Sequence, residues 1–397
     1  MSYIKNKLIY LRYFVHRFIL NKNFYPISLN PFVDINEVML SAYSTFYGYY
    51  DFVINNNNGC TIFLEENVSK LNIILKKGDK YITLGTTKSW NFQQGCMLSW
   101  FDESKTQIIF NEFDVYKNAY FSKVLDLNGN LIQEFDFPIQ SIGIKSKLGL
   151  SINYDRLSVL RPEYGYSCKT DIVLDDENDG IWIFSLNKSF KSKLIITLSS
   201  LKLKENLKSN IIDQKVNHLV LNNEENFFIF LYRFKIGLKR FHRLYLSDIH
   251  GNVTLLSNKM VSHYTWLDNE NVVFFGENEN YELGYYIINT KSKKIKLISK
   301  KLPKADGHPV VINENYLIFD TYPGLDRFSK LFLFDIKNDN LIQIGAFYQP
   351  FYFIGSKRVD LHPKLSFDNN ICYIESAHKN NIRTLYEINI SNLITNE

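Results

Sequence analysis

The sequence predicts an all-β protein whose strands form a seven-bladed β-propeller. A histidine returns at the same point of a repeated unit, and its copies are 45, 45 and 54 residues apart: His218, His263, His308 and His362. The first two intervals match the length of a four-stranded propeller blade, and the third accommodates one longer loop. Aromatic residues make up 15% of the chain, and such side chains favour half-buried strands.

Each of these histidines opens a unit of alternating apolar stretches and polar turns. The first turn of the unit is rich in Asn, Asp and Glu, at 222–226, 268–271, 313–315 and 368–370. The outer half of the unit is a hairpin, as at 124–132, where Asn128-Gly129 supplies the positive-φ turn that hairpins favour. Four antiparallel strands repeated radially make a propeller.

The first half of the chain fits the same frame. Seven units result if one equivalent position is occupied by Asp51, Gln94, Asn153, His218, His263, His308 and His362. A six-bladed ring is the alternative, in which the unit around Asn153 merges with a neighbour. The last unit ends on a single outer strand at 384–390. We therefore expect residues 25–29 to donate the strand that closes the ring and removes its exposed edge.

Residues 1–24 stand apart from this single propeller domain, which spans residues 25–397. Apolar residues recur there at helical spacing with basic residues between them, at Ile4, Leu8, Leu11, Val15 and Ile19. The pattern predicts a short basic amphipathic helix. Such a helix either packs on the ring as an arm or docks on a membrane surface or a protein partner.

Composition narrows the class of protein. The net charge of +5 is mild, whereas nucleic-acid binding usually comes with a concentrated basic face, so no nucleic-acid partner is expected. The four cysteines are widely spaced, which is typical of isolated thiols. No apolar run is long enough to span a bilayer and no signal-peptide pattern is present. We expect a cytoplasmic protein, peripheral to the inner membrane face if residues 1–24 dock there.

The recurring polar position is the first candidate site. Inner strands of a propeller line its central channel, so equivalent positions form a ring around one mouth. Histidine and carboxylate side chains that converge there can hold a divalent metal or act as acid and base. Asp306 and Asp360 lie next to this ring in the sequence. The alternative for each histidine is structural, a hydrogen bond to neighbouring backbone at a strand start.

A second candidate is the loop that contains Arg156, Arg161, Tyr164 and Tyr166. Arginine offers a planar fork for a carboxylate or a phosphate, and tyrosine offers a flat face with a polar tip that suits a sugar ring. The alternative is a solvated loop locked by tyrosine packing.

Three further polar stretches accompany these candidates. Residues 233–243 form a strongly basic run, which is either a solvated hairpin or, if it folds over the mouth, part of an anion site. Residues 320–327, with Asp320 and Tyr322, follow His308, and residues 375–378 follow His362. A polar loop between strands is the preferred interpretation for the last two.

The units Asp306-Gly307-His308-Pro309 and Asp360-Leu361-His362-Pro363, with 375–378 after them, resemble oligogalacturonate lyase-type propellers and their TolB/WD40-like relatives. The chain from Tyr49 to His378 also resembles uncharacterised propellers associated with bacterial surface-polysaccharide biosynthesis. That second resemblance rests on 49–51, 93–95, 161–166, 261–264 and 320–323.

The lyase resemblance implies a seven-bladed ring with a manganese-type site of His and Gln that acts on uronate sugars by β-elimination. His362 matches a ligand of the Gln-x-x-His-x-His motif, while Asp360 and Lys357 stand at the other two motif positions. Asp360 can still ligate a metal, but a charged Lys357 cannot. His308 and His263 are candidates for the remaining ligand, and we predict a divalent metal held by His308, Asp360 and His362.

Two functions follow from these residues. In the first, the mouth binds or acts on an acidic saccharide or sugar-phosphate in surface-polysaccharide metabolism, whether as an enzyme or not. His218 and His263 then supply the acid and base, Arg161 grips the anion, and the substrate is contacted by Asp51, Gln94, Asn153, Arg156, Tyr164 and Tyr166. In the second, the ring is a non-catalytic scaffold in a polysaccharide-assembly complex, docked by residues 1–24.

Overall fold

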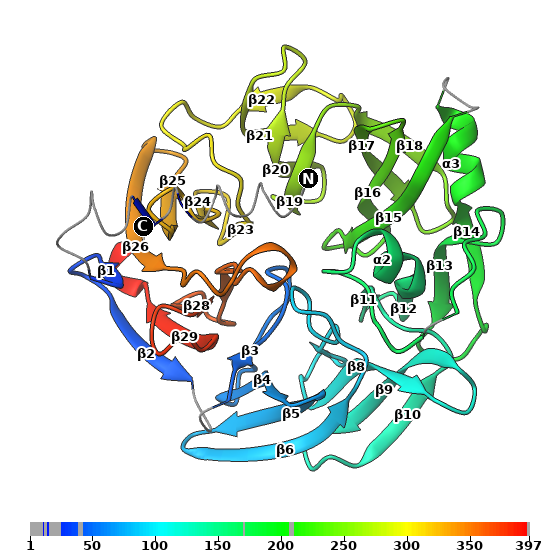
Figure 1. Cartoon of the computed structure of the whole chain (residues 1–397), viewed down its shortest axis with the longest axis horizontal. Coiled ribbons are helices and arrows are strands. Elements are labelled where there is room, and N and C mark those ends of the chain that lie inside the picture. Colours follow the sequence, from blue (N-terminus) through cyan, green and yellow to red (C-terminus); the bar gives the residue numbers. More distant parts are fainter. Residues whose placement is uncertain are drawn as a thin grey trace.

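The structure is a computed structural model that describes residues 25–38, 43–169, 171–205 and 210–394, together with Leu11, Phe14 and Val15. Seven antiparallel sheets are arranged around a central axis (Figure 1). The predicted seven-bladed β-propeller is therefore confirmed, and the six-bladed alternative is excluded.

Each blade takes four strands from inside to outside. The first three blades are β3 (Thr45–Phe46), β4 (Cys60–Asn67), β5 (Lys70–Lys77) and β6 (Lys80–Thr87); β7 (Ser99–Trp100), β8 (Gln107–Asp114), β9 (Ala119–Asp126) and β10 (Leu131–Phe135); and β11 (Ser141–Gly143), β12 (Leu148–Ile152), β13 (Gly180–Ser185) and β14 (Lys193–Thr197). The fourth and fifth are β15 (Ile211–Leu221), β16 (Phe227–Ile236), β17 (Lys239–Asp248) and β18 (Val253–Ser257); and β19 (Val261–Trp266), β20 (Asn271–Glu277), β21 (Leu283–Asn289) and β22 (Ile295–Leu297).

The last two blades use the N-terminal segment of the chain as well as the C-terminal one. The sixth is β23 (Pro309–Val311), β24 (Tyr316–Asp320), β25 (Phe328–Asp335) and β26 (Asn340–Tyr348), with β1 (Ile27–Leu29) as a fifth strand; the seventh is β27 (Lys364–Leu365), β28 (Ile371–Ser376), β29 (Thr384–Asn389) and β2 (Asp34–Val38). The predicted closing segment, 25–29, is thus wrong by a few residues. Closure from the N-terminal segment holds, but β2 closes the ring, because Ile35 pairs with Ile388, while β1 extends the blade before it.

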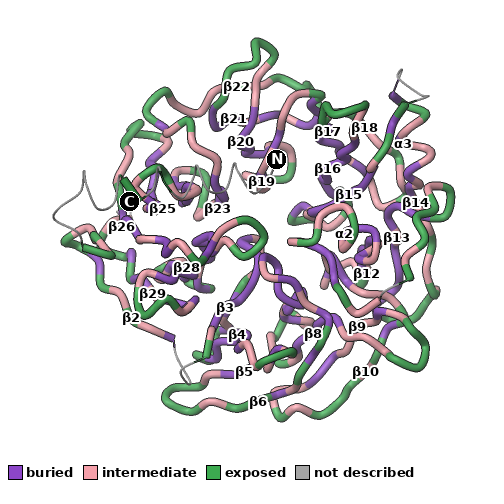
Figure 2. The backbone as a smooth tube through the Cα atoms, viewed as in Figure 1, coloured by how far each residue is buried: buried purple, intermediate pink, exposed green. Residues whose placement is uncertain are grey.

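The core lies between the blades. Middle strands are buried on both faces because each sheet packs against two neighbours, and so their sequences are apolar without alternation. In β16 seven consecutive residues, Phe228–Phe234, are buried. Figure 2 shows burial concentrated in the inner and middle strands, with exposed residues at the rim. Arg233 is the one charged member of that run.

Two short helices interrupt the pattern. α2 (Tyr154–Leu160) follows β12 and lies beside the central axis, whereas α3 (Leu198–Lys204) lies at the rim (Figure 1). The side chain of Asn153 accepts a hydrogen bond from the backbone N–H of Arg156 and so caps α2. Asn153 therefore follows the second strand of its blade, and the expectation that it lies on an inner strand is wrong.

The predicted helix at 1–24 falls almost entirely outside the described residues. Leu11, Phe14 and Val15 are helical and exposed. None of the helices in the described part of the chain has the length and apolar character needed to span a membrane. Two single-turn 3-10 helices, η2 (Gly355–Lys357) and η3 (Ser391–Leu393), complete the secondary structure of the described residues.

Candidate metal and saccharide site

Four histidines occupy one register position in the last four blades. His218 lies three residues before Leu221, the last paired residue of its inner strand, and the other three stand at the same place before Trp266, Val311 and Leu365. Counting back in the same way from Trp100 and Gly143 gives Met97 and Gln140 in the second and third blades. In the first blade, Asn55, which forms an isolated bridge to Thr61 beyond β3, gives Phe52. The predicted ring positions Asp51 and Gln94 are therefore displaced along the chain.

The histidines meet inside the ring. The ring centroids of His263 and His308 are 4.1 Å apart, and those of His308 and His362 are 4.5 Å apart. All of these side chains are buried. His263, His308 and His362, which lie far apart in the sequence, are therefore neighbours in the structure.

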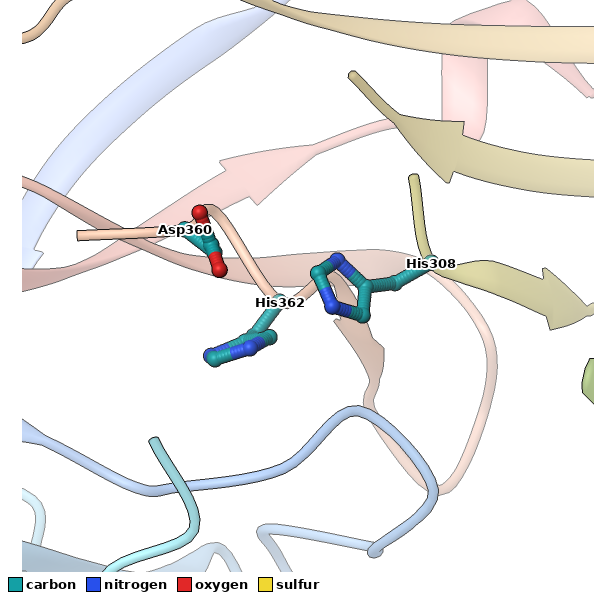
Figure 3. A group of neighbouring side chains, drawn as sticks. All are labelled: His308, Asp360 and His362. Atoms are coloured by element: carbon teal, nitrogen blue, oxygen red, sulfur yellow. The ribbon is translucent and has the colours of Figure 1, made fainter. Parts of the chain in front are cut away.

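His308, Asp360 and His362 bring one ligand atom each within 4.8 Å of one another (Figure 3). The Nδ1 atom of His308 lies 3.0 Å from both carboxylate oxygens of Asp320. A carboxylate at Nδ1 fixes the tautomer that leaves Nε2 free to bind a metal. The Nε2 atom of His308 has no hydrogen-bond partner among the described residues.

His362 is also available for a ligand. Both of its ring nitrogens lack a hydrogen-bond partner in the described part of the chain, although Nδ1 lies 3.7 Å from the carboxylate of Glu375. Buried polar atoms are nearly always hydrogen-bonded, so the unpaired imidazole nitrogens of His308 and His362 require an explanation. A divalent cation bound there would supply that partner.

Asp360 differs from a free ligand because it is already ion-paired. Arg358 Nη2 lies 2.7 Å from one carboxylate oxygen, and Arg358 Nε contacts the other. Arg358 also stacks on Tyr322, with its guanidinium carbon 3.8 Å from the ring centroid. Lys357 lies in η2 and is exposed. The donor set therefore fits a metal through its two histidines, with Asp360 shared between cation and arginine.

The two predicted acid/base histidines each face a carboxylate. His218 Nε2 lies 3.0 Å from Asp51, and His263 Nδ1 lies 2.9 Å from Asp306. Burial lowers the pKa of both imidazoles, and the carboxylates only partly oppose this effect. The lowered pKa favours the neutral imidazole, which is the form that a general base needs. Their catalytic roles stay predictions.

Two tyrosines fill the space between the histidines, a feature that the repeat pattern did not indicate. Tyr49 makes edge contacts with His218 and His362 at centroid distances of 4.7 and 5.3 Å. Tyr50 donates a hydrogen bond of 2.8 Å from its hydroxyl to the backbone oxygen of Tyr264. The segment 49–51 thus crosses the channel instead of lining it, which explains how Asp51 reaches His218.

The loop after α2 contributes unevenly to this mouth. Arg161 contacts Glu163 at 2.5 Å and lies over Tyr164, 4.8 Å from its centroid, and Tyr164 packs edge-on against Tyr49. These residues therefore border the histidine cluster. The side chain of Arg161 is 31% exposed, so ligand can reach it.

The other predicted substrate residues have structural partners. Arg156 is buried against Asp179 and also pairs with Asp176 at 3.0 Å. Tyr166 stacks on Tyr154 with a centroid distance of 4.1 Å. Both side chains are therefore held by contacts within the fold and are not available to a ligand. Gln94 is buried next to Gln93, which donates a hydrogen bond to the backbone oxygen of Arg358.

A groove of about 860 Å³ is lined by aromatic side chains, including Trp90, Phe92 and Tyr352. Glu163, the partner of Arg161, and Lys357 also line it. Its flat apolar faces and mixed polar groups are of the kind that hold sugar rings.

Residues that sequence reasoning missed act mainly as partners of the histidines. Asp320 and Glu375 lie in stretches that the sequence indicated as polar loops, but both are fully buried at strand ends. Their signal was a carboxylate at the end of the strand that follows each His-Pro pair. Arg358 carried no signal beyond its closeness to Asp360 in the chain.

Comparison with known proteins supports the architecture. No protein-family model matches the sequence, and no curated protein matches it. A solved oligogalacturonate lyase in complex with manganese aligns with a TM-score of 0.64 at 12% identity, over 92% of this chain and 96% of that chain. An oligogalacturonate lyase from Vibrio parahaemolyticus aligns with a TM-score of 0.59 at 10% identity, over 92% and 96%.

TolB from Acinetobacter baumannii matches more weakly, with a TM-score of 0.40 at 13% identity over 74% of this chain and 64% of that chain. The predicted resemblance to oligogalacturonate lyase-type propellers is confirmed as a likeness of fold.

Proposed function

We propose that this propeller binds a divalent cation and an acidic saccharide at the mouth that His308 and His362 border. The observation that supports it best is the set of buried imidazole nitrogens without partners, with the His308 tautomer fixed by Asp320. The solved lyase with the same fold is described as a complex with manganese, which makes manganese the first cation to test.

The cation would be held by His308, His362 and Asp360. When bound, it would withdraw electrons from a sugar carboxylate and so acidify the neighbouring C–H group. In this proposal Arg161 binds the anion, Tyr164 contacts the sugar, and the imidazole of His263 accepts a proton. The aromatic groove gives room for further sugar units.

A second candidate is a metal-free binding propeller, and the Arg358–Asp360 ion pair favours it. An arginine that already neutralises a ligand carboxylate reduces the charge that attracts a cation. In that case the same mouth serves recognition in a polysaccharide-assembly complex. Docking through residues 1–24 and a location at the inner membrane face belong to this candidate as proposals.

The deciding experiment is metal analysis of purified protein equilibrated with manganese and then freed of unbound metal. We expect one manganese per chain in the wild type and none in the His308→Ala/His362→Ala double variant. His250→Ala is the matched control because His250 is exposed on a rim hairpin. Manganese retained by the double variant, or absent from the wild type, would reject the metal site and leave the second candidate.

A further inference from the structure

A row of three basic side chains crosses the fourth blade near the mouth. Lys215 on β15 pairs in register with Arg233 on β16, and Arg233 pairs with His242 on β17. Residues directly opposite in an antiparallel sheet have neighbouring Cβ atoms on the same face, and like charges there are destabilising. The cross-strand pair of Lys215 and Arg233 should therefore lower the stability of the folded protein.

Burial increases that cost. Lys215 is 7% exposed and Arg233 is 9% exposed. Arg233 Nε has no hydrogen-bond partner among the described residues, and its Nη2 reaches only backbone oxygens of Val261 and Ser262 at 3.4 and 3.5 Å. Lys215 Nζ contacts only the backbone oxygen of Asp213, at 3.0 Å. Buried charges are normally paired with an opposite charge.

The counter-charge is not supplied from within the described chain. No carboxylate of a described residue forms an ion pair with Lys215 or Arg233. The carboxylate of the nearby Asp213 is ion-paired with Lys235. The residues outside the described ranges contain a single acidic side chain, Glu397. Two cations are thus desolvated together, with backbone oxygens as partners and no carboxylate of a described residue in an ion pair with either.

Neighbouring groups are affected by this positive charge. Burial, Arg161 and Arg233 lower the pKa of Lys215 to about 8. Burial and Arg233 lower the pKa of His242 to about 4. Arg161 is the C-cap residue of α2, and α2 packs against β15, so this partly exposed arginine lies at the edge of the same blade. Burial and the charge of Arg161 also lower the pKa of Arg233. The row is therefore open to the mouth at its Arg161 end.

We propose that Lys215, Arg233 and Arg161 form a binding site for one anionic group of the ligand, a carboxylate or a phosphate. The inference rests on the proposed function, since it assigns the anion of the acidic ligand to particular residues. Arg156, which the sequence suggested for this role, is ion-paired with Asp179. The proposed site instead uses Lys215 and Arg233 from the neighbouring blade. The guanidinium of Arg233 offers its unpaired Nε–H, and the ammonium of Lys215 adds charge.

The test is calorimetric titration with galacturonate, galactose and inorganic phosphate at constant ionic strength, on the wild type, Arg233→Met and Lys215→Met. Arg240→Met is the matched control, since it removes the same charge from an exposed position of the same blade. We expect galacturonate or phosphate to bind the wild type and the control alike, and each buried variant to bind roughly tenfold more weakly or worse. Galactose, which lacks the anion, should not bind detectably.

Stability separates this role from a purely structural one. If Lys215 and Arg233 serve ligand binding and not the fold, replacing either with Met removes a charge repulsion. Without ligand, Arg233→Met and Lys215→Met should then melt at or above the melting temperature of the wild type. Unchanged anion affinity in both variants, no binding of either anion to the wild type, or lower melting temperatures in both variants would overturn the proposal.

The outcome is independent of the metal question. Both variants should still bind manganese at the wild-type ratio, because neither residue belongs to the histidine cluster. If the wild type binds manganese but the two variants bind the anions as well as the wild type does, only the anion site is rejected. If the variants lose anion affinity but the wild type binds no manganese, only the metal site is rejected. Binding of phosphate but not galacturonate would keep the anion site and identify the ligand as a phosphate.

Discussion

The two sides of the ring use the same register position for different purposes. Blades four to seven place a histidine there, whereas the first three place Phe52, Met97 and Gln140. The first blades instead send loops across the mouth: the segment 49–51 fills the channel, and the loop after α2 borders it. One half of the ring thus supplies the candidate ligands, and the other half supplies their walls.

This division explains why regular spacing predicted the site only in part. Where a blade contributes a side chain from its inner strand, the residue repeats at the blade period, and His263, His308 and His362 are visible in the sequence. Where a blade contributes a loop, no period exists. The prediction that Asn153 and Gln94 occupy the repeated ring position is wrong because both residues lie outside the inner strands.

The fold itself was more predictable than the site, because blade stacking demands strands of apolar residues whatever the loops do. The closing strand was the exception. Both β1 and β2 are short, partly exposed segments that fit an outer-strand position, and only the hydrogen-bonding partners distinguish them. By residue type, Arg156 and Arg161 were equally suitable to bind an anion. In the structure, Arg156 forms a buried ion pair with Asp179, whereas Arg161 is partly exposed.

The largest effect is expected where the two halves are joined, at Glu375. This fully buried carboxylate accepts hydrogen bonds from Lys364, from Arg383 and from the backbone N–H groups of Tyr47 and Gly48. Glu375→Gln leaves two buried cations without a counter-charge, which should lower the free energy of unfolding by about 3–5 kcal/mol. Urea denaturation measures it.

The control for that experiment is Glu387→Gln on the same blade. Glu387 pairs with Lys76 at 3.3 Å, and its side chain is 20% exposed, so the loss should stay below about 1 kcal/mol. Equal losses in the two variants would mean that Glu375 does not join the halves of the ring.

A middle-sized effect is expected on the histidine side, at Asp320. Burial alone would raise the pKa of Asp320, but its electrostatic interaction and hydrogen bonds with His308 outweigh burial and lower the pKa to about 2. A depressed carboxylate pKa stabilises the fold above the ordinary pKa near 3.8, and this stabilisation disappears as the pH falls toward 2. The contribution is about 2 kcal/mol.

Asp320→Asn should therefore be less stable than the wild type at pH 6, and the gap should narrow between about pH 4 and pH 2. Denaturant titrations at several pH values follow it. A gap that is constant with pH would show that the carboxylate charge is not what orients His308.

The smallest effect is expected on the wall side, at Tyr166. Its hydroxyl accepts a hydrogen bond of 2.8 Å from the side-chain amide of Asn111. Because Asn111 keeps a second bond to Ile139, Tyr166→Phe should cost only about 1 kcal/mol and leave anion binding unchanged. Weaker anion binding with unaltered stability would instead return Tyr166 to the ligand site, where sequence reasoning first placed it.

The closing strand also sets the order of events during synthesis. β2 leaves the ribosome long before its partner β29, because the strands from β3 to β28 are synthesised between them. At ordinary elongation rates β2 waits on the order of tens of seconds for that partner. Throughout this interval β2 is unpaired, and each end of the incomplete arc of blades exposes an apolar sheet face that a neighbouring blade later covers. A chaperone that shields extended segments would be needed most by this part of the chain, and only while translation is unfinished.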